Sequence, residues 1–99
     1  MTTLVKEVFT TSNQIKDNRT LQDVLTHLMT EVGELAQEIQ IAEGKSYKEH
    51  GKDGVIGEAV DVIVCALDVI KLYNPTIKED YDLSRILQPK LQKWKDTVK

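Results

Sequence analysis

A long apolar segment, residues 55–73, constrains the fold of this 99-residue chain more than any other feature. Valine, isoleucine, leucine and alanine fill most of its positions, and only four of its residues are charged. The segment is too long for a strand, and Asn74-Pro75 ends it because the residue before a proline avoids the helical conformation. We therefore expect a helix that is apolar on nearly all sides and that must be covered by other helices.

Three acidic residues interrupt this apolar surface and lie on one side of it. With Glu58 placed at 0° on a helical wheel of about 100° per residue, Asp61 falls at about −60° and Asp68 at about −80°. A buried carboxylate is costly unless a cation or a metal ion accompanies it, and Lys71 is the only cation of the segment. The same three acids disfavour a membrane span.

Two further helices are predicted before this segment. Apolar residues at helical spacing indicate the first, over about residues 4–15. Thr20 followed by Asp23 resembles a capping box, and Gly44 is a typical residue at a helix end. The second helix should therefore extend over about residues 21–43.

Apolar residues continue at helical spacing from Ile77 to Val98, and Pro89 is expected to split or kink this last segment. No credible strand is found. The expected fold is all-α: a single domain, residues 1–99, that forms a small bundle of about four to five helices. Because the shorter helices cannot cover residues 55–73 alone, we expect a partner subunit to cover the rest, so that the chain forms a homo-oligomer.

The second predicted helix carries three glutamates at the edge of its apolar face. Glu34 and Glu38 lie within about 60° of Glu31 on the wheel, beside the core rather than opposite it. Glu58 and Asp61 repeat the i, i+3 spacing of Glu31 and Glu34, so two adjacent helices can bring these carboxylates together. Such oxygen-rich sites suit magnesium or manganese, whereas zinc prefers histidine or cysteine.

Each of these acids also has an ordinary structural interpretation. The glutamates of the second helix can form a solvated face, and the acids of the third can pair with lysines from elsewhere. For Asp68, an ion pair with a lysine or arginine and a role beside the metal are equally good interpretations. Cys65 is expected to be a small buried apolar residue, and His27 a polar residue at a helix edge.

The acidic pairs form two motifs, ExxE at Glu31 and Glu34 and ExxD at Glu58 and Asp61, with 23 residues between them. In this pattern the chain resembles the MazG-type all-α nucleoside triphosphate pyrophosphohydrolases, whose signature is this pair of motifs on two helices. The resemblance covers about residues 20–95, including the glycine- and lysine-bearing loop between the motifs.

The resemblance implies an enzyme that uses Mg²⁺, or Mn²⁺ in its place, to hydrolyse a ribo- or deoxyribonucleoside triphosphate to the monophosphate and pyrophosphate. The family's metal ligands match Glu31, Glu34, Glu58 and Asp61 here. The implied catalytic residues are Glu34 and Glu38, with Glu38 as a further metal ligand or as the base that orients water. Members of the family form homo-oligomers with substrate pockets near the interface.

The chain departs from the family pattern at three positions. Thr30 and Gly57 directly precede the two motifs, where many relatives carry an acidic residue. Trp94 stands four residues after Lys90, where many relatives carry asparagine or arginine near the phosphates or the base. The recognition of the base is therefore left open.

Five residues are candidates for binding the substrate. Lys90 matches the family's C-terminal lysine, and either Lys93 or Lys95 is placed to supply the charge that Trp94 does not. Trp94 itself is expected either to stack on a base or to fill space between helices. In the loop, Lys45 and Lys52 are expected either to contact phosphate or to be ordinary solvated charges.

Charge is distributed unevenly along the chain. The net charge is −3, but residues 1–84 hold 8 basic and 15 acidic residues, a net of −7, and residues 85–99 carry +4. This is a weak footprint for nucleic acid, so no nucleic-acid partner is expected. The single cysteine and the lack of a secretion signal favour the cytoplasm.

Two alternatives to this enzyme stay open. The chain can be a catalytically weak MazG-like relative that serves as a helical interaction module, with its acids retained for metal-dependent assembly. It can also act on a larger ATP derivative, because the phosphoribosyl-ATP pyrophosphohydrolases have a similar architecture and chemistry.

Overall fold

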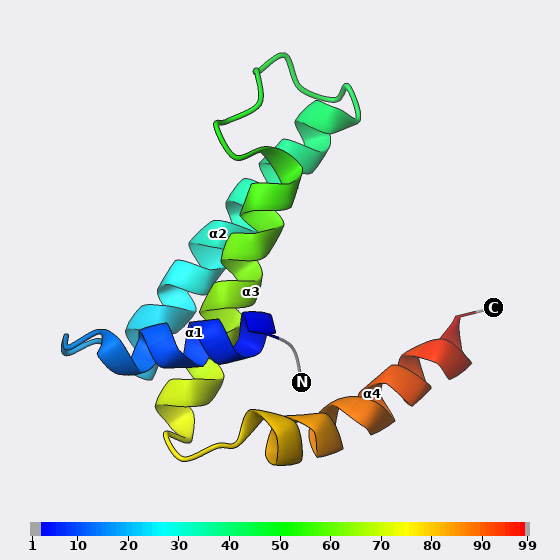
Figure 1. Cartoon of the computed structure of the whole chain (residues 1–99). Coiled ribbons are helices and arrows are strands. Elements are labelled where there is room, and N and C mark those ends of the chain that lie inside the picture. The colour runs from blue at the N-terminus through cyan, green and yellow to red at the C-terminus, as the bar shows by residue number, and fades with distance from the viewer. Residues whose placement is uncertain (1–2, 99) are drawn as a thin grey trace.

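The computed structural model describes residues 3–98, and every regular element in that range is helical (Figure 1). This confirms the predicted all-α class. The elements are α1 (Thr3–Gln14), α2 (Leu21–Ala42), α3 (Gly54–Tyr73), a π-helical turn η1 (Glu79–Leu83) and α4 (Ser84–Thr97). Three of the four α-helices begin and end within a residue or two of the predicted bounds, which is the usual uncertainty of helix ends.

Both ends of α2 are capped as predicted. The Thr20 hydroxyl accepts from the Asp23 amide at 3.1 Å, and the Asp23 carboxylate accepts from the Thr20 amide at 2.9 Å, which completes the capping box. At the other end Gly44 has a φ of +73°, and its amide and the next one donate to carbonyls in the last turn of α2, at 3.0 and 2.8 Å. These two bonds form a Schellman turn, which leads the chain out of the helix.

The antiparallel helices α2 and α3 form the centre of the structure, and α1 crosses them near one end (Figure 1). Val24 of α2 and Cys65 of α3 are buried between the three helices, as are Val5 and Phe9 of α1. The predicted apolar role of Cys65 is confirmed. This small core positions the facing sides of α2 and α3.

A polar cluster fastens α1 to α3. The Arg19 guanidinium donates from Nε and Nη2 to the two oxygens of Asp68, at 3.0 and 2.9 Å. The Ser12 hydroxyl also donates to Asp68, at 2.6 Å. Arg19 and, less strongly, Ser12 hold the pKa of Asp68 below its usual range, although burial opposes them. The ion-pair interpretation of Asp68 is therefore confirmed.

The fourth helix leaves the body of the molecule. After α3, the chain turns through η1, and α4 projects away from the α2–α3 pair (Figure 1). Pro89 lies inside α4 without splitting it, contrary to one of the two expected outcomes. The proline removes the amide that would bond to the Arg85 carbonyl, and because Arg85 is exposed, water can replace that bond.

Much apolar surface stays uncovered on the single chain. The radius of gyration is 15.7 Å, compared with about 13 Å for a compact chain of this length. On the side of α2 and α3 that is lined by Leu21, Leu25 and Ile70, a groove of about 510 Å³ is open to solvent. Among residues 3–98, no helix is both long and apolar enough to cross a membrane.

Replacing Asp68 by asparagine should destabilise the protein. Arg19 would lose its charged acceptor in a partly buried place, which should cost about 2 kcal/mol of unfolding free energy in urea denaturation at neutral pH. Because Arg19 lowers the pKa of Asp68, this contribution is present above about pH 4 and is lost as the pH falls through the folded-state value. The difference between variant and wild type should therefore shrink in acid.

The matched control is Asp17→Asn, which removes the exposed acidic partner of the same arginine. It should cost much less, because exposed ion pairs contribute little. Equal losses for the two variants would contradict the assignment of Asp68 as the anchor of α1.

Candidate metal centre

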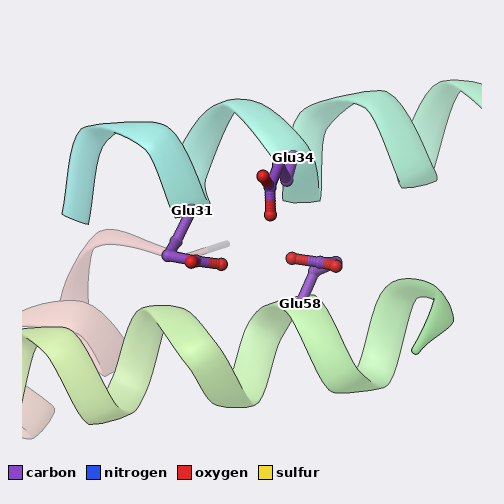
Figure 2. Close-up of side chains that lie close together, drawn as sticks. All are labelled: Glu31, Glu34 and Glu58. Atoms are coloured by element: carbon purple, nitrogen blue, oxygen red, sulfur yellow. The ribbon is translucent and has the colours of Figure 1, made fainter. Parts of the chain in front are cut away.

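Three carboxylates converge between α2 and α3 (Figure 2). Glu31 and Glu34 project from successive turns of α2, and Glu58 projects toward them from α3. One oxygen from each of the three lies within 4.8 Å of the others. Glu31 is 8% exposed, Glu58 is partly buried and Glu34 is exposed, so the group opens to solvent on one side. Three of the four acids of the two predicted motifs thus lie close together between the helices.

Two oxygens of this group are buried without a partner. Within residues 3–98, Oε2 of Glu31 and Oε2 of Glu58 accept no hydrogen bond, and no lysine or arginine forms a salt bridge with either side chain. The other oxygen of Glu31 lies 3.3 Å from Nε2 of His27, an exposed residue at the edge of α2 as expected. Unpaired buried carboxylates are costly, and a bound divalent cation would remove that cost.

Burial and the close spacing of these carboxylates raise the pKa of two of them, Glu31 and Glu58. Burial, the adjacent Glu34, and the charges of Asp61 and Glu31 raise the pKa of Glu58 to about 7. Burial, with Glu34 and Asp61 beside it, also raises the pKa of Glu31. The donors here are carboxylate oxygens, the ligands that Mg²⁺ and Mn²⁺ prefer, so the residues present fit such an ion.

Asp61, the fourth predicted ligand, belongs to a second group that shares Glu58. Its oxygen lies within 4.8 Å of donor atoms of both Glu58 and Asp53. Asp53 was not among the predicted ligands, because on an uninterrupted helix it would lie about 140° from Glu58. Gly54, with a φ of +65°, breaks that register directly after Asp53.

Gly57 makes room for Asp53. A Cβ at position 57 would lie 2.3 Å from the Cβ of Asp53, so the aspartate fills the space that a side chain of residue 57 would occupy. The glycine itself is the sequence signal that could have led to Asp53.

Glu38 lies elsewhere, under the loop between α2 and α3. Its Oε2 accepts from the Gly51 amide at 2.9 Å, and its Oε1 lies 2.8 Å from Nδ1 of His50. The Gly51 amide and His50 hold the pKa of Glu38 below its usual range. Both oxygens of the predicted catalytic residue are thus engaged in anchoring the loop.

The predicted substrate-binding residues are not gathered around the carboxylates of this chain. Lys45 and Lys52 are exposed on the loop, and Lys45 lies 3.4 Å from Glu43. Lys90, Lys93 and Trp94 are exposed on α4, away from the α2–α3 pair (Figure 1).

Comparison of the chain with protein-family models, with curated proteins and with solved structures found no match. What the chain does is therefore inferred from the geometry of its carboxylates.

Without metal, the protein should become less stable as the pH rises from about 5 to about 8. Glu58 has a folded-state pKa of about 7, above the value of about 4.3 expected in the unfolded chain, so its bound proton favours the folded state at low pH. That stability is lost as the pH rises through the folded-state value. The melting temperature measured in chelator should fall over this range, and added Mg²⁺ should restore it most strongly at the alkaline end.

Glu58→Gln should flatten this pH dependence, because an amide has no proton to lose. Glu49→Gln, an exposed loop acid outside both carboxylate groups, is the matched control and should keep the wild-type profile. A wild-type profile in the Glu58 variant would contradict the shifted pKa.

Proposed function

We propose that this chain is a magnesium-dependent nucleoside triphosphate pyrophosphohydrolase of the MazG type. The observation that carries the proposal is the pair of buried, unpartnered oxygens of Glu31 on α2 and Glu58 on α3, which lie with Glu34 in one group between the two helices. A structural cluster would pair these oxygens with lysine or arginine, as Asp68 is paired with Arg19. A cation that arrives with its substrate explains why they are left without such a partner.

The proposed ligands are Glu31, Glu34, Glu58 and Asp61, with Mn²⁺ able to replace Mg²⁺. When bound, the metal would neutralise polyphosphate charge and acidify a water molecule. The chain's own contribution is position: Glu31 and Glu58 are held by the packed helices, and Glu34, on the open side, is the acid best placed to orient water. Hydrolysis would give a monophosphate and pyrophosphate.

The loop between α2 and α3 is the proposed site of the first phosphate contacts. It carries Lys45 and Lys52 and leads directly into the first turns of α3, where Glu58 lies. Glu38 fixes this loop through Gly51 and His50, so we assign Glu38 a positioning role rather than proton transfer. Lysines near an acidic metal centre balance the charge of a triphosphate.

The protein with Mg²⁺ should convert at least one member of a panel of ribo- and deoxyribonucleoside triphosphates to monophosphate and pyrophosphate, resolved by chromatography and phosphorus NMR. Chelator should stop the reaction. Glu34→Gln and Glu58→Gln should each lower turnover by about 100-fold or more, because each removes charge that is organised for the transition state. Glu49→Gln, an exposed acid outside both carboxylate groups, should leave turnover unchanged.

Three other results have definite meanings. Diphosphate with phosphate as products would show that a different bond is cleaved. Turnover confined to a larger ATP derivative would favour the phosphoribosyl-ATP type of activity. Magnesium binding without turnover of any of these compounds would favour the interaction module.

We also propose that the chain works as a homodimer or homotetramer. The apolar groove beside Leu25 and Ile70, and exposed Met29, Val32 and Ile63 on the same two helices, form a surface too apolar for a stable monomer. A second α2–α3 pair would cover it as in a four-helix bundle.

Leu25→Asp together with Ile63→Asp should shift the protein toward monomer in sedimentation velocity, because each places a charge in that interface. Glu43→Gln should sediment like wild type. A wild-type protein that is monomeric at micromolar concentration would contradict the oligomer.

A further inference from the structure

Helix α4 carries an apolar stripe that nothing in the described part of its own chain covers. Leu87, Leu91 and Trp94 recur at helical spacing, and all three are exposed, Trp94 by 67%. In its own chain, α4 packs against the η1 turn and projects away from the α1–α3 body (Figure 1). An isolated helix of this length is marginal in water, so the stripe needs a surface to pack on.

The charge of α4 indicates what kind of surface that is. Residues 84–98 have four basic residues and one acidic residue, a net of +3, whereas residues 3–73 have seven basic and twelve acidic residues, a net of −5. Lys90 and Lys95 flank the apolar stripe on its two sides. Opposite charges around an apolar contact steer and orient association.

The α1–α3 body offers a cleft of matching character. A cavity of about 470 Å³ lies between α1 and α2, over the Val64 and Cys65 region of α3. Its walls are mainly apolar, with Leu4 and Ile15 exposed, and Glu7 and Asp23 are its acids outside the Arg19–Asp68 pair.

We propose that this cleft binds α4 of a second copy of the chain. Each copy would give its α4 to the other, which makes a closed two-fold exchange. Because α4 of the same chain lies away from the body, a second copy is the occupant that the arrangement favours (Figure 1). Lys90 and Lys95 beside the stripe, against Glu7 and Asp23 in the cleft, favour the same pairing.

The exchange would complete the carboxylate centre. His27 lines the cleft and also lies 3.3 Å from Glu31, so a helix in the cleft ends beside the metal ligands. Lys90 and Lys95 of one copy would then face polyphosphate held by the carboxylates of the other. This last step rests on the proposed function, whereas the docking of α4 does not.

The single natural cysteine allows a direct test, because Cys65 lines the cleft. Leu87→Cys, Leu91→Cys and Trp94→Cys each place a second thiol on the stripe. After mild oxidation, at least one of the three should run mostly as a disulfide-linked dimer on a non-reducing gel. Gln92→Cys, on the opposite side of α4, should stay unlinked, and so should each stripe variant that also carries Cys65→Ala.

Three outcomes would overturn the proposal. A fast-migrating monomer with an internal disulfide would mean that α4 folds back on its own chain. A dimer that persists with Cys65→Ala would mean that two α4 helices pair with each other. Absence of any link in all three stripe variants would mean that α4 docks elsewhere or not at all. None of these results depends on turnover, so the failure of the proposed function would be seen separately.

The step that involves the lysines has its own test, made by mixing variants. Glu34→Gln and a Lys90→Ala, Lys95→Ala double variant should each be inactive alone. Mixed and allowed to exchange, they should regain about a quarter of wild-type turnover, since half of the dimers would hold one intact site of two. No recovery, with α4 cross-linked in trans, would overturn the role of these lysines.

Discussion

The structure depends on the cost of taking carboxylates out of water. Helices α2 and α3 pack closely enough to bury Glu31 and partly bury Glu58, yet two of their oxygens have no partner within the described residues. The same kind of problem is solved one turn beyond Cys65 by an arginine that reaches Asp68 from the segment after α1. Helix α3 therefore carries both a satisfied acid, Asp68, and an unsatisfied one, Glu58. The contrast separates a site that holds the fold together from one that is prepared for a ligand.

Local signals predicted most of the fold. The Thr20 cap, the Gly44 turn and the apolar spacing of residues 55–73 each act within a few residues, so they can be recognised without knowing what the helices touch. The fate of Pro89 could not be predicted in this way. Whether a proline splits a helix depends on how the freed carbonyl is satisfied, and that depends on exposure. The departure of α4 from the body is likewise a property of packing, not of spacing.

The same division holds for the candidate centre. Spacing of i, i+3 on two helices was enough to predict that Glu31, Glu34 and Glu58 meet, because helical geometry determines which side chains share a face. It was not enough for Asp53, which reaches Glu58 through a break in the helix, or for Glu38, which bonds to a loop. Residues placed by loops lie outside what periodicity can describe.

The close contact between Asp53 and Gly57 makes the residue that is allowed at one position depend on the residue at the other. A carboxylate beside Glu58 can come from either position, but not from both, because the two Cβ atoms would lie only 2.3 Å apart. The two positions should therefore change together: an acid at 57 requires a smaller or displaced residue at 53, and an acid at 53 requires glycine at 57. The additional carboxylate ligand of the centre can therefore come either from the residue before α3 or from α3 itself, and the charge of the centre is the same in both cases.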